Sequence, residues 1–424
     1  MKKLIEILNG VKKASGWQIT ESAKTSNELF FVHEKLETVR ATDTVDTLVT
    51  IYVEHDDCLG DSSFSVYSYM SDEDILNKIN AAIERAKLVF NRPYKLVEGE
   101  KLVAEIPSDM NGKDKIELAE SIADAVFAAK APEGGSLNAL EVFVNDVKTR
   151  VVNSCGLDKT QTKRYAFVEA IPTFTDEKQS VEVYFSADFS NFDKDKLTED
   201  ISTKLAEAKA RSVAQKPTTP MRVNVVLRAD DISALLDELS SDMSYSAAYT
   251  QSDYYKIGDD ICGGNGDKIT LTLFGVVEGS KASSYFDDDG VALSSVTLVN
   301  DGVVTAKHGS NRFGQYLGVE RPSGVLPCKA LETGSLSQEK LSSEPYIECV
   351  ALSALQVDVY SDYIGGEIRT AFYHDGKSCT PVTGITMSAK LSEVLKTALL
   401  SDKCVVQGSY KGPDKMLLKN VSVL

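Results

Sequence analysis

The chain has 424 residues and a formal net charge of −17, with 42% hydrophobic and 26% charged residues. This composition is typical of a folded protein, and the length suffices for two hydrophobic cores. The sequence has no run of about 18 apolar residues that would predict a membrane span. So acidic a chain without a Lys/Arg cluster repels a nucleic-acid backbone, so we expect no nucleic-acid binding. We also expect no membrane association and a cytoplasmic protein.

The cysteine pattern argues against a disulfide-rich protein. Seven cysteines are scattered along the chain, and no two form a Cys-x-x-Cys pair. An odd number at wide spacing in a large chain predicts neither a disulfide framework nor a zinc ribbon. We expect most of them to be small buried hydrophobic residues.

The first half alternates helical and strand patterns. The N-terminal residues 1–10 are typical of an amphipathic helix rather than a signal peptide. Further helices are predicted after a capping sequence at Ser71, after Asn111-Gly112, and from about Lys194, each with one apolar stripe. Segments 48–53, 64–69 and 181–185 are rich in β-branched and aromatic residues and predict strands.

The second half is richer in strand patterns, and the two halves meet at a proline-containing segment. Pro217 and Pro220 disfavour both helix and sheet, so residues 216–220 are predicted as a linker between domains 1–215 and 221–424. Strands are expected over residues 223–227 and 268–277, tight turns at Asp301-Gly302 and Asp375-Gly376, and a late helix from Leu391. Adjacent strands without intervening helices predict an α+β fold with mostly antiparallel sheets and packed helices.

Several segments, in the same order, resemble the TldD/PmbA (modulator of DNA gyrase) peptidase family. They are the turn Asn153-Ser154-Cys155-Gly156, the strand-to-helix step from Val225 to Leu236, the segment Phe286-Asp287-Asp288-Asp289-Gly290, and Asn300-Asp301-Gly302 that follows it. The resemblance implies two domains, dimers, and cytosolic proteolysis of unfolded peptides. Its catalytic branch carries a His-Glu-x-x-x-His helix whose histidines, with a downstream cysteine, bind zinc. The other branch lacks these ligands and partners the catalytic chain.

The register of this resemblance places Asp237 and Asp242 at the two histidine positions and Glu238 at the general base. The four histidines, His33, His55, His308 and His374, are all distant from this helix in the sequence. A histidine zinc site on the helix is therefore not expected, and we predict no metal and no cofactor for this chain. Zinc is expected only on a catalytic partner.

Three acidic or cysteine features each have a functional and a simpler interpretation. Asp237, Glu238 and Asp242 could hold a hard cation through oxygen ligands, although a solvated helix face explains them more simply. Cys404 lies where the family places its cysteine ligand, but without histidines we expect an inert thiol. The segment Asp287-Asp288-Asp289-Gly290 lacks the spacing of a calcium loop and predicts a turn.

Three hypotheses for function follow. The first is a metal-less subunit that pairs with a TldD-like catalytic chain and helps to bind unfolded peptides. The second is a metal-dependent peptidase in its own right, with carboxylate ligands at Asp237, Glu238 and Asp242. The third is a homodimeric peptide-binding or regulatory protein.

Overall fold

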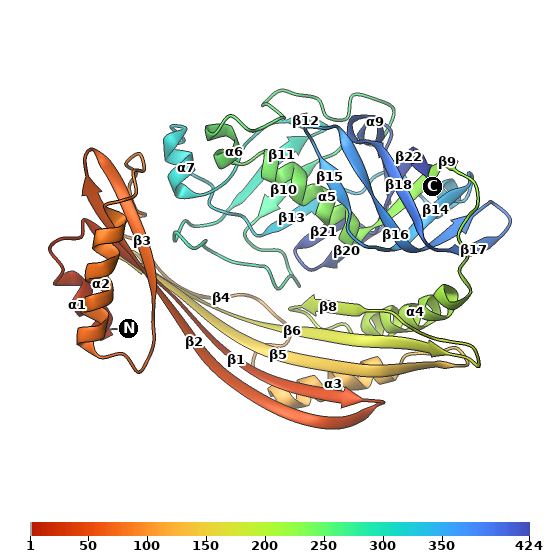
Figure 1. Ribbon diagram of the computed structural model, residues 1–424, viewed down its shortest axis with the longest axis horizontal. Coiled ribbons are helices and arrows are strands. Elements are labelled where there is room, and N and C mark those ends of the chain that lie inside the picture. Colours follow the sequence, from red (N-terminus) through yellow and green to blue (C-terminus); the bar gives the residue numbers. More distant parts are fainter. Residues whose placement is uncertain (1) are drawn as a thin grey trace.

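The computed structural model describes residues 2–424, and it divides into a long curved sheet built by the first half and two smaller sheets built by the second (Figure 1). The first sheet has the strand order β3-β2-β1-β5-β6-β4, with β7 and β8 also paired to β6. Its strands are β1 (Gly16–Val32), β2 (Lys35–His55), β3 (Cys58–Val66), β4 (Lys101–Glu105), β5 (Gly135–Asn153), β6 (Asp158–Thr175), β7 (Ser180–Glu182) and β8 (Phe185–Phe189). Among residues 2–424, only β4 pairs in parallel in this sheet.

Four helices cover this sheet: α1 (Lys2–Asn9), α2 (Asp72–Ala86), α3 (Lys115–Phe127) and α4 (Lys194–Val213). Helices α1 and α2 pack around Trp17, Ile19 and Ile51 at the end of the sheet that carries β3. Helices α3 and α4 pack around Val142 and Val168 farther along the long strands. The predicted helices are present, and Ser71 and Asp74 form the predicted capping box at α2.

The long strands are the main feature that sequence patterns did not predict. Strand β2 alone runs for 21 residues, and residues 35–46 of it are exposed on nearly every side chain. Without a buried face, no alternation of polar and apolar residues marks the strand. Two shorter predictions were also wrong: the chain turns after Val66 instead of continuing as a strand, and β7 and β8 are separated at residues 183–184.

The second half contains two sheets. One has the order β12-β11-β10-β13-β21-β20 and the other has the order β14-β9-β22-β18-β16-β15. The first comprises β10 (Leu271–Phe274), β11 (Ser295–Asn300), β12 (Val303–Val304), β13 (Cys328–Leu331), β20 (Cys404–Gln407) and β21 (Tyr410–Pro413). The second comprises β9 (Met221–Arg228), β14 (Tyr346–Leu352), β15 (Gln356–Asp358), β16 (Tyr363–His374), β17 (Cys379–Val382), β18 (Ile385–Lys390), β19 (Leu399–Leu400) and β22 (Lys415–Val423).

One large core joins these two sheets to α5 (Ala229–Asp242) and α9 (Leu391–Leu395). The other helices of this half are α6 (Tyr245–Tyr249), α7 (Asn311–Tyr316) and α8 (Gln338–Leu341), and Leu341 of α8 packs in a smaller cluster with Val226 and Tyr346. The strand predicted over residues 268–277 is shorter than expected, since only Leu271–Phe274 pairs. The turn at Asp301-Gly302 is present, with φ of 49° and 84°. The fold is thus α+β with mostly antiparallel sheets, as predicted. Among residues 2–424, no helix is long and apolar enough to cross a membrane.

Candidate functional site

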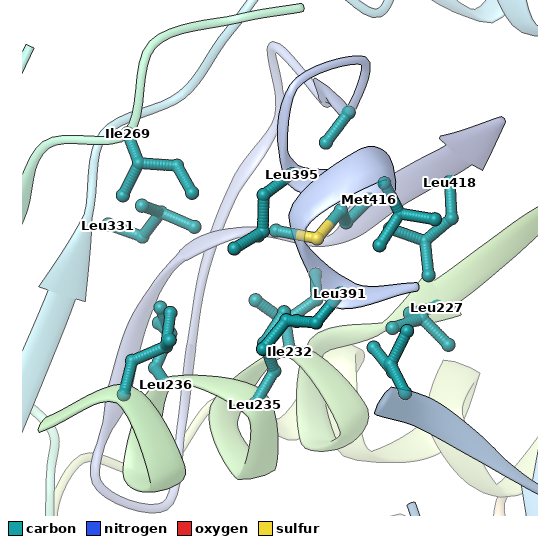
Figure 2. Close-up of a cluster of buried hydrophobic side chains, with 14 of the residues drawn as sticks. Leu227, Ile232, Leu235, Leu236, Ile269, Leu331, Leu391, Leu395, Met416 and Leu418 are labelled. Atoms are coloured by element: carbon teal, nitrogen blue, oxygen red, sulfur yellow. The ribbon is translucent and has the colours of Figure 1, made fainter. Parts of the chain in front are cut away.

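Helix α5 is the segment at which the sequence places its candidate site, and a stripe of leucines sets its rotation. Ile232, Leu235, Leu236 and Leu239 are fully buried, at the spacing of one helical face. Figure 2 shows this face directed at Leu391 and Leu395 of α9 and at Met416 and Leu418 of β22. With that stripe turned inward, the intervening positions Asp237 and Glu238 are forced to the surface.

Asp237 is bound by a lysine that the sequence did not single out. Lys329 of β13 directs its ammonium at Asp237 Oδ1. The lysine side chain is only 5% exposed, whereas the aspartate side chain is 64% exposed. Because a buried ammonium needs an anionic or polar partner, this ion pair compensates Lys329. The position at which the resemblance would place the first histidine therefore already carries a protein cation.

The other two positions do not converge with Asp237. Glu238 is exposed and forms no hydrogen bond or ion pair with any described residue. Asp242 is buried, and its Oδ1 and Oδ2 accept the backbone N–H groups of Tyr254 at 2.6 Å and Tyr255 at 2.9 Å. Asp242 therefore holds the loop that follows α6 against the end of α5, which is a structural role.

These residues do not fit a metal ion. One carboxylate is neutralised by an ammonium, one is free in solvent, and one is occupied by backbone donors. Cys404 begins β20, is exposed, and contacts the carbonyl oxygen of Val405. Within residues 2–424, no group of three His, Cys, Asp or Glu side chains is arranged to hold a metal. The three acidic residues of α5 therefore supply no ligand set for zinc or for a hard cation.

The fold does bring one distant histidine to α5. His308 Nε2 lies 3.0 Å from the carbonyl oxygen of Ser240, in the last turn of the helix. Burial lowers the pKa of His308, so the ring is neutral near pH 7 and Nε2–H donates to that carbonyl. His308 thus caps α5 at its C-terminal end and does not join the three acidic residues.

The acidic segment before β11 is a turn, as predicted. The carboxylate of Asp287 accepts the N–H groups of Asp289, Val291 and Val325 at 2.9–3.1 Å. Gly290 adopts a φ of 82°, which favours glycine. Backbone donors occupy the Asp287 oxygens that a calcium ion would need, while the carbonyl oxygens of Asp288 and Gly290 accept from Gln18 and Lys159 in the first half.

Two carboxyl groups that the sequence analysis missed lie in the first turn of α5. Burial and, to a lesser extent, the neighbouring Asp230 raise the pKa of Asp231 to about 7. Burial also raises the pKa of Asp230, whose Oδ1 accepts from Gln407 Nε2 at 2.6 Å. The sequence did contain a signal for these two carboxyl groups. It is the Asp-Asp pair that directly follows a buried strand, where few cationic partners are expected.

A network of buried charges connects α4 to this region. Arg228, the last residue of β9, donates from Nη1 to Glu207 at 2.5 Å and from Nε to Glu348 at 3.0 Å. Glu207 also accepts from Lys204 on α4, and Glu348 also pairs with Lys415 on β22. Arg228 therefore ties the first half of the chain to the strand that leads into α5.

The fold and this site define a class of protein. It is a two-domain α+β chain whose first half forms a long curved sheet and whose second half is strand-rich, with strand β9 leading directly into helix α5. Residues 220–424 match the family of PmbA/TldA metallopeptidase C-terminal domains. No curated protein sequence matches the chain.

Solved structures share the fold over the whole chain, including three from different organisms. TldE from Thermococcus kodakarensis is 16% identical, with 100% of this chain and 99% of that one covered and a TM-score of 0.78. A candidate modulator of DNA gyrase from Thermotoga maritima is 15% identical, with 100% of both chains covered and a TM-score of 0.75. Another from Bacteroides thetaiotaomicron is 15% identical, with 100% and 97% covered and a TM-score of 0.77. The second half of the chain, residues 220–424, therefore matches the C-terminal domain of the PmbA/TldA family, and the whole chain shares the fold of these structures.

Proposed function

We propose that this chain is the metal-less subunit of a peptidase complex and that it pairs with a TldD-type catalytic chain. The observation that carries the proposal is the ion pair between Lys329 and Asp237. A buried ammonium at the first ligand position opposes a divalent cation there by charge repulsion. The likeness in fold to a protein named TldE supports the same assignment.

The proposed contribution of this subunit is to bind unfolded peptide. Peptides of varied sequence are best recognised through their backbone, by addition of a strand to a free sheet edge. Strand β2 offers such an edge, because β3 pairs with it only over residues 47–55. Residues 35–46 have no strand partner on that side among the described residues, and Val39 and Val45 are more than half exposed there.

The test is co-purification followed by a peptidase assay. A tag on this chain should recover a chain with a His-Glu-x-x-x-His helix from the native cell extract in equal amount. The pair should cleave unfolded casein, and replacement of the partner's glutamate in that motif should abolish cleavage.

The matched variant is Glu238→Gln in this chain. In the proposed subunit it leaves cleavage by the pair unchanged, because Glu238 contacts no other described residue. If the isolated chain cleaves casein with added metal and Glu238→Gln abolishes that activity, the chain is a peptidase in its own right and the proposal is wrong. Recovery of this chain only with copies of itself would equally overturn it and favour a homodimer.

A further inference from the structure

A cysteine and a histidine face each other across the hairpin formed by β16 and β17, away from α5. His374 ends β16 and pairs with Cys379, which begins β17. Directly paired residues of an antiparallel hairpin project their side chains from the same face. The Asp375 carboxylate accepts the N–H groups of Lys377 at 2.8 Å and Ser378 at 2.6 Å, which holds the connecting turn in place.

The imidazole is held in a defined orientation. Its ring stacks on Tyr346 of β14, with centroids 4.3 Å apart and planes 11° apart. Nε2 lies 3.8 Å from Cys379 Sγ and 4.0 Å from Glu348 Oε2. The other oxygen of Glu348 already receives Arg228 at 3.0 Å and Lys415 at 3.2 Å, so that carboxylate is fixed by cations on its far side.

The Cys379 side chain is exposed, and the His374 side chain is 26% exposed. The two residues line a cavity of about 270 Å³. Ser342, Glu344, Tyr346 and Lys377 complete most of the wall. The Lys377 ammonium opposes a cation in this cavity, whereas the carboxylates of Glu344 and Glu348 favour one.

We propose that Cys379 and His374 bind one copper(I) ion. Metal–sulfur and metal–nitrogen bonds of about 2.3 and 2.0 Å sum to more than the 3.8 Å between Sγ and Nε2, so one ion reaches both atoms without strand movement. A thiolate selects soft cations such as copper(I), which accepts as few as two ligands. Binding releases the thiol proton to solvent.

Other metals fit this pair less well. Zinc in proteins takes four ligands, and among residues 2–424 no third His, Cys, Asp or Glu joins the pair in a metal-binding arrangement. Magnesium and calcium prefer oxygen ligands. The proposal is independent of the peptidase-subunit assignment, since it uses no residue of α5.

The experiment is anaerobic titration of the full-length protein with copper(I) in competition with bicinchoninate, an optical copper(I) chelator. Wild-type protein should remove one copper(I) ion per chain from the bicinchoninate complex. Cys379→Ser should abolish this binding, and His374→Gln should weaken it about 10-fold or more because it removes the nitrogen ligand. The matched control is Cys404→Ser, which removes an exposed thiol whose described contact is a carbonyl oxygen.

A second measurement needs no variant. One equivalent of copper(I) should slow alkylation of Cys379 by iodoacetamide, while the exposed thiols of Cys155 and Cys404 react at their original rates. The proposal is wrong if the wild-type protein removes no copper from bicinchoninate, or if His374→Gln binds as tightly as wild type. Equal protection of all three thiols would also overturn it, because that is the behaviour of unspecific thiol binding.

Discussion

Arg228 Nη1 lies 2.5 Å from Glu207 Oε1, and this contact joins α4 in the first half of the chain to β9 in the second. Glu207 is 4% exposed at its side chain, and Glu348, the other partner of Arg228, is 11% exposed. Two buried carboxylates therefore share one guanidinium, and each has one lysine as a further partner. This ion pair links the strand that leads into α5 to α4.

Replacement of Arg228 should destabilise the protein strongly. Arg228→Met leaves Glu207 with Lys204 and Glu348 with Lys415, so both carboxylates stay buried with less compensation. We expect the free energy of unfolding to fall by about 3 kcal/mol, the cost typical of a broken buried ion pair. Urea denaturation measures this loss. Lys196→Met, which breaks an exposed pair with Asp200, is the control and should cost under about 0.5 kcal/mol. Equal losses for the two variants would show that the Arg228 network contributes no special stability.

The pair of Lys329 and Asp237 should respond asymmetrically to substitution. Asp237→Ala leaves a nearly buried ammonium without its anion and should cost about 2 kcal/mol. Lys329→Met removes the buried charge and leaves Asp237 in solvent, so it should cost less than about 1 kcal/mol. Thermal and urea unfolding of both variants test this order. The reverse order would mean that Lys329 is compensated by something other than Asp237.

Asp242 and Glu238 should differ sharply although they lie four residues apart on one helix. Asp242→Ala leaves the N–H groups of Tyr254 and Tyr255 without acceptors in a buried setting, which should cost about 2–4 kcal/mol. Glu238→Ala should change the free energy of unfolding by less than about 0.5 kcal/mol. If both substitutions instead reduce bound metal without affecting stability, the two carboxylates are ligands after all.

Stability should depend on the ionisation of Asp231. Its pKa is raised to about 7 from 3.8, so the folded state favours the protonated form. The associated stability is fully present below pH 4 and is lost as the pH rises through 7. Asp231→Asn removes this loss. At pH 8.5 the free energy of unfolding of the variant should exceed that of wild type by up to about 4 kcal/mol. At pH 5 the difference should fall to about 1.6 kcal/mol, because only the part of the loss between pH 4 and pH 5 has then occurred.

Urea denaturation of wild type and Asp231→Asn at both pH values provides the test. Asp287→Asn is a useful comparison, since burial also raises the pKa of Asp287, in this case to about 6. A difference between wild type and Asp231→Asn that stays constant from pH 5 to pH 8.5 would mean that Asp231 ionises normally in the folded protein.

The sequence by itself determined the features that depend on local pattern. The apolar stripe of α5, the capping box at Ser71 and the Asp301-Gly302 turn are set by residues within a few positions of one another. The α+β class followed from the same patterns, and so did the absence of a histidine pair on α5. The long strands were not predicted because residues 35–46 of β2 bury neither face. A strand that is exposed on both sides shows no alternation of polar and apolar residues.

Only the tertiary structure decided what the side chains of the site do. Asp237 and Asp242 are both acidic and both lie on α5, yet one pairs with Lys329, 92 positions away, and the other binds the backbone of a loop. Arg228 reaches Glu348 across 120 positions in the same way. The role of a charged side chain depends on its burial and on its partner, and both are settled by which distant strands and helices pack beside it.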